Sequence, residues 1–305
     1  MYTEGSLKDA MFFLKAFSSN FLARFAPGIY VKLTKDTGRA SDDGDAHDVA
    51  NYHLECFNDY CEYLELPHDD LEHYLKGKEI LEYGPGDILG TALLFYAHGA
   101  EKVHCVDQFP LTRMSNKNID VYKHIIESLD GKPKQRAMRA FKIEGDIKNG
   151  FNESEINYAV TKIGLSDENN KFDIIISRSV LEHVINLEQT MLNIKSCLKP
   201  DGVSVHQVDL RSHGLDRYKE YDFLTWPNCI YQLMYSHKGF PNRWRLNKYK
   251  ELAESSNLNI IKLKATGFVK KENLDIVLPK VAHKFRGIDH EELSWLGFWM
   301  CLEHA

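Results

Sequence analysis

Short apolar runs alternate with helical patterns along most of this chain. Buried strands are predicted over Glu79–Leu81, Lys102–Asp107, Ala140–Glu144, Ile174–Ile176, Val203–Val208, Asn259–Leu263 and Leu293–Glu303. The uninterrupted apolar run Ile174–Ile176 is typical of a strand that is buried on both faces of a parallel sheet. Strands separated by helices therefore indicate an α/β fold built on such a sheet.

The segments between these strands have the spacing of amphipathic helices. Helices are predicted over residues 10–25, Val49–Leu66, Asp69–Lys76, Leu89–His98, Leu111–Leu129, Val184–Leu198, Lys248–Ser256 and Leu274–Phe285. The first helix mixes large apolar residues with Lys15 and Arg24 and stops near Pro27. It fits a helix packed on the core or on the second subunit of a homodimer. Peripheral membrane contact through residues 10–25, or a lid over an apolar substrate, is the alternative.

Composition and charge limit the classes of function. The 305 residues carry a formal charge of -6, which gives no general attraction to nucleic acid or anionic lipid. No apolar run approaches the length that a bilayer demands, and the basic run Lys132–Lys142 is interpreted as a solvated crossover. The six cysteines have no paired spacing, which favours free thiols and a cytoplasmic location. The acidic loop Thr34–Asp48 lacks a complete calcium pattern, so we predict no metal site.

A glycine turn follows the first predicted strand, in the sequence Glu82-Tyr83-Gly84-Pro85-Gly86. Two closely spaced glycines let the backbone approach a ligand, and the amides at the next helix start favour an anionic group. A dinucleotide fingerprint needs a third glycine at position 89, which is leucine here. The carboxylate of Glu82 would repel a pyrophosphate and attract an ammonium group. The turn is therefore predicted to hold the cationic tail of an amino acid.

Asp107 ends the second predicted strand, about twenty residues after the glycines. A carboxylate in that position can accept hydrogen bonds from both hydroxyls of a ribose. Together the turn and this acid resemble those of the class I S-adenosylmethionine-dependent methyltransferases, whose glycine motif has the form E/D-x-G-x-G. The resemblance covers residues 79 to 209 and, more loosely, the rest of the chain. It implies S-adenosylmethionine as the cofactor.

The resemblance also implies the fold. The expected architecture is a Rossmann-like, seven-stranded mixed sheet flanked by helices and ending in an antiparallel hairpin. Residues 1–78 are expected to form an N-terminal helical cap, and residues 79–305 the methyltransferase domain. Residues 210–246 lack sheet periodicity and are rich in aromatic side chains, so they are expected to form a helical insertion after the fifth strand.

Further cofactor contacts are implied by the same resemblance. Gln108 would lie near the adenine, Asp146 would accept a hydrogen bond from its amine, and Ile147 would pack on its ring. Ser177 and Arg178, at the end of the fourth strand, would line the methionine part. The complete predicted cofactor-binding set is Glu82, Tyr83, Gly84, Pro85, Gly86, Asp107, Gln108, Gly145, Asp146, Ile147, Ser177 and Arg178.

Candidate catalytic residues lie at the end of the fifth predicted strand and just after it, because ligands of open α/β sheets bind beyond the carboxyl ends of the strands. Methyl transfer to a hydroxyl requires removal of a proton, and histidine is suited to accept it near neutral pH. We predict His213 or His206 as the general base, with Asp209 as its orienting partner. His183 is a third candidate, although it also fits a structural role at a helix start.

The aromatic insertion offers candidate substrate contacts. Aromatic walls with a few fixed polar groups suit a small organic or sugar acceptor. The predicted substrate-binding residues are Arg211, Tyr218, Trp226 and Arg243. Ordinary packing of an inserted segment is the alternative interpretation.

The sequence thus predicts an S-adenosylmethionine-dependent methyltransferase that acts on a hydroxyl, or an amine, of a small molecule or sugar-type acceptor in biosynthesis. A non-catalytic cofactor-binding scaffold of the same fold and an NAD-dependent dehydrogenase are the alternatives. The intact acids Glu82, Asp107 and Asp146 favour the enzyme over a scaffold. The glycine spacing disfavours the dehydrogenase.

Overall fold

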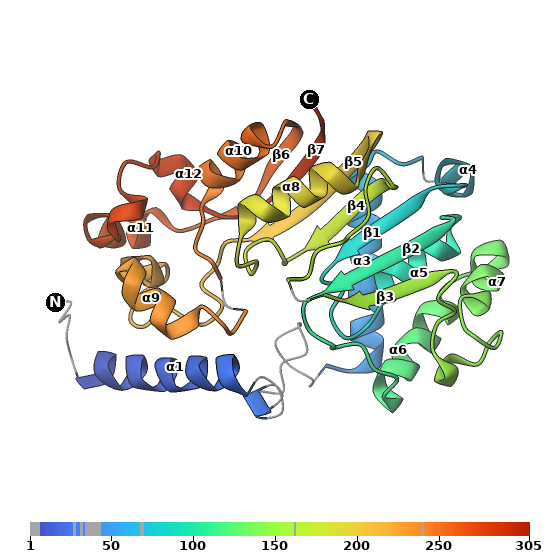
Figure 1. The fold of residues 1–305 in the computed structure, drawn as a ribbon, viewed down its shortest axis with the longest axis horizontal. Helices are drawn as coiled ribbons and strands as arrows, with labels where there is room; N and C mark the ends of the chain where they lie inside the picture. The colour runs from blue at the N-terminus through green and yellow to red at the C-terminus, as the bar shows by residue number, and fades with distance from the viewer. Residues whose placement is uncertain are drawn as a thin grey trace.

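The computed structural model describes residues 7–26, 29–30, 33, 44–67, 70–161, 163–239 and 241–305. These residues form a seven-stranded sheet in the order β3-β2-β1-β4-β5-β7-β6 (Figure 1). The strands are β1 (Glu79–Tyr83), β2 (Lys102–Asp107), β3 (Ile156–Val160), β4 (Phe172–Arg178), β5 (Leu198–Asp209), β6 (Leu258–Phe268) and β7 (Trp295–His304). Strands β1 to β5 pair in parallel, and β7 runs antiparallel between β5 and β6. The predicted mixed sheet with a terminal hairpin is confirmed.

Helices cover both faces of this sheet (Figure 1). The helices are α1 (Leu7–Phe25), α3 (Ala46–Tyr63), α4 (Leu71–Leu75), α5 (Gly90–Ala97), α6 (Asn116–Glu127), α7 (Gly131–Arg139), α8 (Leu187–Cys197), α9 (Asn228–Tyr235), α10 (Leu246–Ser255), α11 (Lys271–Val277) and α12 (His290–Ser294). Short 3-10 turns are η2 (Ile147–Asn149), η3 (Asp222–Thr225), η4 (Leu278–Lys280) and η5 (His283–Phe285). Among the described residues, none of these helices combines the length and apolarity needed to cross a membrane.

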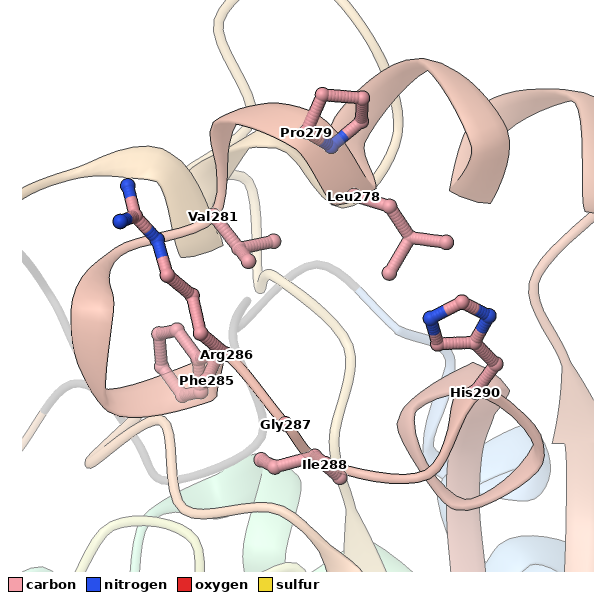
Figure 2. Close-up of a pocket in the computed structure, with 8 residues that line it drawn as sticks. All are labelled: Leu278, Pro279, Val281, Phe285, Arg286, Gly287, Ile288 and His290. Carbon is pink, nitrogen blue, oxygen red and sulfur yellow. The ribbon is translucent and has the colours of Figure 1, made fainter.

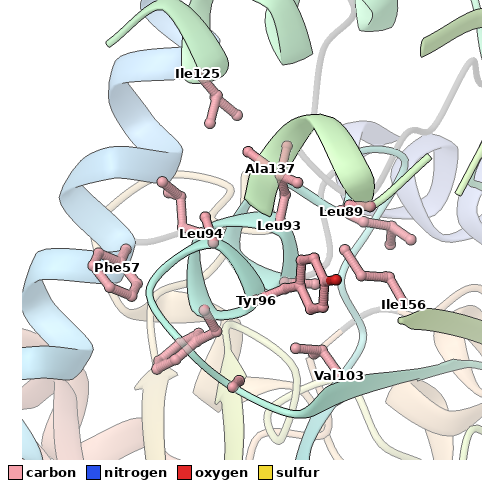
Figure 3. Packing of buried hydrophobic residues seen from close by; sticks show 14 of the residues in the cluster. Phe57, Leu89, Leu93, Leu94, Tyr96, Val103, Ile125, Ala137 and Ile156 are labelled. Atoms are coloured by element: carbon pink, nitrogen blue, oxygen red, sulfur yellow. The ribbon is translucent and has the colours of Figure 1, made fainter. Parts of the chain in front are cut away.

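Two hydrophobic cores form because successive strand residues point to opposite faces of the sheet. Ile80 and Ile174 pack with α3, α5, α6 and α7, whereas their neighbours Leu81 and Ile175 pack with α8 and α10. The first of these cores is drawn in Figure 3, where Phe57 of α3 lies beside the α5 side chains. All eight residues of α5 are buried, since the helix is enclosed by the sheet on one side and by other helices on the other.

The third strand is not where the sequence pattern predicted it. The expected strand Ala140–Glu144 is a loop after α7, and Phe141 makes only an isolated bridge with Phe151. The true third strand, β3, is an edge strand whose last residues are exposed, with polar Asn157 inside it. Because β3 is not buried on both faces, it lacks the continuous apolar run that marks the other strands.

Residues 210–246 form a separate layer that carries α9. A third hydrophobic core joins this segment to α1 and α11, and Phe223 and Met234 within it are fully buried. Figure 1 shows α1 lying along α9, apart from the sheet. Asn20 of α1 donates to the Leu233 carbonyl at 3.0 Å, and Lys238 donates to the Ala16 carbonyl at 3.0 Å. The N-terminal helices therefore split between two places: α1 belongs to the inserted segment, and α3 to the core on the sheet.

Candidate functional site

The turn after β1 is built by two glycines in left-handed backbone conformations. Gly84 has a φ of 59° and Gly86 a φ of 78°, values that residues with a side chain rarely adopt, and Pro85 between them is half-buried. The Gly84 amide donates to the Val106 carbonyl at 2.8 Å, which ties the turn to the end of β2. A Cβ on Gly84 would lie 2.5 Å from Cγ2 of Val180, in the loop after β4. A glycine is therefore required both by the turn and by the close approach of this loop.

The carboxylate of Glu82 lies at the end of β1 and is almost fully buried. The thiol of Cys105, its partner in the β1–β2 pairing, donates to Oε2 at 3.8 Å. Burial raises the pKa of Glu82 to about 8, and the contact with Cys105 offsets this only in part. No cationic side chain among the described residues lowers this pKa. A cationic group brought by a ligand would restore the charged carboxylate.

Asp107 ends β2 beside the same turn. Its Oδ1 accepts a hydrogen bond from the Phe109 amide at 2.9 Å, and the side chain is buried. Burial raises the pKa of Asp107, while the amides of Phe109, Gln108 and Gly86 lower it. The acid is thus held in place by main-chain groups of its own loop and of the glycine turn.

Helix α3 forms a wall beside these acids. Arg178, at the end of β4, pairs with Asp59 of α3 at 2.6 Å and lies 5.4 Å from the centre of the Trp299 ring. Burial raises the pKa of Cys56 on α3 to about 11, and both Arg178 and Glu82 also act on that thiol. The three elements α3, β1 and β4 therefore meet at one place. The helical pattern predicts that Cys56 is buried, but it carries no signal that this part of α3 faces the glycine turn.

Three predicted site residues make hydrogen bonds in the interior of the protein instead of lining the site. The Tyr83 hydroxyl donates to Oδ1 of Asn193 in α8 at 2.6 Å, on the face opposite to α3. Oγ of Ser177 lies 2.7 Å from Nδ1 of His206, and neither side chain is exposed at all. Burial lowers the pKa of His206 to about 3, so its ring is neutral at physiological pH. A substrate in solution cannot reach His206 in this arrangement.

The segment Gly145–Ile147 lies elsewhere than the resemblance implied. It stands in the loop between α7 and β3, before the third strand rather than after it. Asp146 caps η2, since it accepts hydrogen bonds from the Lys148 amide at 3.2 Å and from Nδ2 of Asn149 at 2.6 Å. Ile147 packs in the core beneath α6. Asp146 thus does not occupy the carboxyl end of β3, because the predicted third strand was wrong.

The loop that does follow β3 lies against Asp107 and Gln108. The Thr161 amide donates to the Asp107 carbonyl at 2.9 Å. A Cβ on Gly164 would lie 3.2 Å from the Gln108 amide nitrogen, so the two loops are in close contact. Sequence reasoning missed Thr161 and Gly164 because no acid or glycine motif marks them.

The remaining candidate histidines lie together beyond the ends of β4 and β5. The rings of His183 and His213 pack edge to face with centres 4.9 Å apart. Nε2 of His213 lies 4.0 Å from Oδ1 of Asp209, and Asp209 also accepts a hydrogen bond from Nε of Arg211 at 2.9 Å. His183 does not start a helix, because α8 begins later, at Leu187. The structure thus brings together three of the four predicted catalytic residues.

A family model described as a methyltransferase domain matches residues 51–263, which is more than half of the chain. The chain belongs to this methyltransferase family. It is an S-adenosylmethionine-dependent enzyme, as the glycine motif and Asp107 led us to expect. The matched segment begins inside α3 and ends inside β6. The domain boundary expected after residue 78 stays a prediction.

Several known methyltransferases are similar to parts of the chain. Over 54 residues it is 35% identical to a ubiquinone biosynthesis O-methyltransferase of Rickettsia typhi, an alignment that covers 18% of this chain and 22% of that relative's length. An S-adenosylmethionine-dependent methyltransferase of Mesorhizobium loti is 12% identical, with a TM-score of 0.41 over 75% of this chain and 91% of that chain. The geranyl diphosphate C-methyltransferase of Streptomyces coelicolor A3(2) is 12% identical, with a TM-score of 0.44 over 81% and 77%.

The residues at the turn of this methyltransferase fit its cofactor. Within the part of the chain that the structure describes, no cationic side chain acts on the buried carboxylate of Glu82, which suits the ammonium group of the cofactor's methionine part. Asp107 is fixed beside the turn as a hydrogen-bond acceptor, which suits a ribose diol. Gly84 and Gly86 follow β1, which pairs with β2 and β4, and their lack of side chains leaves the main chain of the turn accessible to the cofactor.

The predicted substrate contacts of the methyltransferase are mostly used within the protein. The Tyr218 hydroxyl donates to Asp9 at 3.0 Å, and Trp226 stacks against Phe12 of α1. Arg243 is buried, and it donates to the main-chain carbonyl of Trp226 at 2.8 Å while lying over the Tyr231 ring. Arg243 is therefore not available to a substrate in this arrangement. Arg211 is exposed, although its guanidinium is paired with Asp209.

A surface depression lies in the C-terminal segment of the methyltransferase (Figure 2). It is lined by Leu278, Pro279, Val281, Phe285, Arg286, Gly287, Ile288 and His290. None of these residues comes from the ends of β1, β2, β4 or β5. The depression is thus separate in sequence from the glycine turn and from the histidine cluster.

Proposed function

We propose that this methyltransferase moves a methyl group from S-adenosylmethionine to a hydroxyl, or an amine, of a small molecule or sugar-type acceptor. The observation that carries the proposal is the group Asp209, His213 and His183 beyond the carboxyl ends of β4 and β5. That edge of the sheet also carries the glycine turn. An acceptor held at the histidines would face a donor held at the turn.

The cofactor supplies the activated methyl group as a sulfonium. The tasks of this chain are then to align the acceptor, to exclude water and to take the acceptor's proton. His213 is the better placed proton acceptor, since it is partly exposed and has Asp209 beside it. Burial, and next the neighbouring His213, lower the pKa of His183 to about 4, which makes that ring a weak base.

In the cofactor crevice we assign Glu82 to the ammonium group and Asp107 to the ribose. The main chain of the glycine turn would lie against the methionine part. Thr161 and Gly164, in the loop after β3, take the place near the adenine that Asp146 was expected to fill. Support for this assignment comes from the contact of that loop with Asp107 and Gln108.

The test separates the enzyme from its alternatives. Calorimetric titration with S-adenosylmethionine, with its demethylated product and with NAD is expected to give binding of the first two only. Binding of NAD alone would indicate a dehydrogenase, which the carboxylate of Glu82 argues against. Methyl transfer to a panel of phenols, sugars and amines then tests catalysis. His213→Ala is expected to lower turnover by about 100-fold with cofactor affinity unchanged, the usual contribution of a general base. A protein that binds the cofactor but methylates nothing in the panel would support the scaffold.

We further propose that α1 makes peripheral contact with an anionic membrane surface. One face of α1 packs on α9, while its other face exposes large apolar side chains, namely Leu7, Met11, Leu14, Phe21 and Phe25. Lys15 and Arg24 are also exposed, whereas Asp9, which is the only acid in the helix, turns inward to Arg217. An apolar face with basic flanks suits the interface of a bilayer that contains anionic lipid.

A further inference from the structure

Glu182, His183 and His213 place their side chains at one point beyond the ends of β4 and β5. One potential ligand atom from each lies within 4.8 Å of the others. Nε2 of His183 is 3.9 Å from Oε1 of Glu182. The three residues come from two separate loops, so no spacing rule reveals them in the sequence.

Glu182 is a buried carboxylate that faces these rings without a hydrogen bond. The residue is 1% exposed, and neither of its carboxylate oxygens has a hydrogen-bond partner among the described residues; Nδ1 of His183 is also buried and has no such partner among them. The Asp209 amide and the Ser179 hydroxyl lie near this carboxyl group. An uncompensated buried carboxyl group is costly, which indicates a missing partner.

The loops around the cluster hold it in place. The Asn242 amide donates to the Glu182 carbonyl at 2.6 Å, and Nδ2 of Asn242 donates to the Leu181 carbonyl at 2.9 Å. His213 adopts a left-handed backbone conformation with a φ of 49°, and Gly214 follows with a φ of 79°. Strained backbone of this kind persists where surrounding structure fixes it, and it concentrates at functional sites.

We propose that Glu182, His183 and His213 bind a divalent cation that holds the acceptor of methyl transfer. Two imidazole nitrogens and one carboxylate suit first-row transition ions and zinc better than magnesium or calcium. Three protein ligands leave coordination positions open toward the exposed side of His213. Asp209, 4.0 Å from Nε2 of His213, would orient that ring from outside the ligand set.

This inference rests on the proposed function and changes how the proton is removed. A hydroxyl bound to the cation has a lowered pKa, so its O–H bond breaks and the proton leaves to water. The new C–O bond then forms as the S–CH3 bond of the cofactor breaks. The histidines act as ligands in this scheme, and neither ring needs to accept the proton.

The test measures metal binding apart from activity. Full-length protein is stripped with a chelator and titrated with Co2+ and Zn2+ by calorimetry, with the visible absorption of Co2+ as a second signal. We expect one saturable site, with affinity lowered at least about 100-fold in Glu182→Gln and His213→Ala. The control is His290→Ala, an exposed histidine that lines the surface depression and is not part of the cluster, which should bind as wild type does.

The outcomes separate the two proposals. Absence of a saturable site, or a site that Glu182→Gln leaves unchanged, overturns the cation site. Full methyl transfer by stripped protein also overturns it, while the proposed function stands. Saturable cation binding without any binding of S-adenosylmethionine supports the site and removes the proposed function. A neutral Glu182 that donates to the buried hydroxyl of Tyr249 is the structural alternative, and it predicts no cation binding.

Discussion

Oγ of Ser177 lies 2.7 Å from Nδ1 of His206, across the pairing of β4 and β5. Both side chains are fully buried, so the ring depends on this hydroxyl for a hydrogen bond at that nitrogen. Ser177→Ala is expected to lower the free energy of unfolding by about 1 to 3 kcal/mol, because a buried polar atom is left unsatisfied. Chemical denaturation at neutral pH measures this, and a change near zero would contradict the assigned hydrogen bond.

The same pair makes stability depend on pH. Burial lowers the pKa of His206 from 6.5 to about 3, so between those values the unfolded chain binds a proton that the folded protein does not. This contribution to stability is complete above pH 6.5 and is lost as the pH falls toward 3. The free energy of unfolding, measured by denaturation at a series of pH values, should therefore fall less steeply between pH 7 and pH 4 for His206→Gln than for wild type.

Glu82 should make cofactor binding depend on pH. Burial raises the pKa of Glu82 to about 8, so in the cofactor-free protein the Glu82 carboxyl is largely protonated at neutral pH. An ammonium group favours the ionised form, and binding should therefore strengthen as the pH rises through 8 and should release a proton at pH 7. Calorimetry of the demethylated cofactor in two buffers of different ionisation enthalpy measures that proton. In Glu82→Gln this proton release should disappear. If the number of protons released on binding is the same as in wild type, Glu82 is not the contact of the ammonium group.

Asp107 and Asp146 form a matched pair, because the sequence assigned both to the cofactor and the structure separates them. Asp107→Ala is expected to weaken cofactor binding by about 1 to 3 kcal/mol through loss of a charged hydrogen bond. Asp146→Ala should change the affinity little, since Asp146 caps η2 away from the end of β3. Titration of both variants checks this. If the two variants lose equal cofactor affinity, Asp146 does contact the adenine, as the sequence led us to expect.

Most of the fold follows from the sequence because buried parallel strands leave a clear signal. Glu79–Tyr83 and Lys102–Asp107 lie where apolar runs predict strands, and the glycine motif lies between β1 and α5. The sequence did not predict β3 correctly because β3 is a half-exposed edge strand, and Asp146 was therefore assigned to the wrong place. The sequence did not identify Glu182 as a site residue, because only the folded loops bring it close to His213.

Gly84 should be intolerant of any side chain. Gly84→Ala puts a Cβ 2.5 Å from Val180 and also forces a residue with a side chain to a φ of 59°. The strained backbone alone costs about 1 to 3 kcal/mol, and the clash adds to it. Gly131→Ala is the control, because its φ is +56° with nothing within 4 Å of the added Cβ, so it carries the strain without the clash.

Thermal and chemical denaturation of these two glycine variants isolates the contact with Val180. Adding Val180→Ala to Gly84→Ala should recover part of the lost stability, whereas adding it to Gly131→Ala should not. If Val180→Ala restores stability in both backgrounds, or in neither, then Val180 does not clash with the side chain introduced at Gly84.

The exposed face of α1 provides the last prediction. Met11→Glu and Phe21→Glu should abolish sedimentation with vesicles of phosphatidylcholine mixed with phosphatidylglycerol, because each places a charge in the apolar stripe. Wild type should bind these vesicles more strongly than vesicles of phosphatidylcholine alone, and salt should weaken the difference, since Lys15 and Arg24 flank the stripe. Lys123→Glu, at an exposed position of α6, is the control for a change in charge away from α1. If wild type ignores both kinds of vesicle and instead sediments as a dimer that Phe21→Glu dissociates, the stripe is an interface between two copies of this chain.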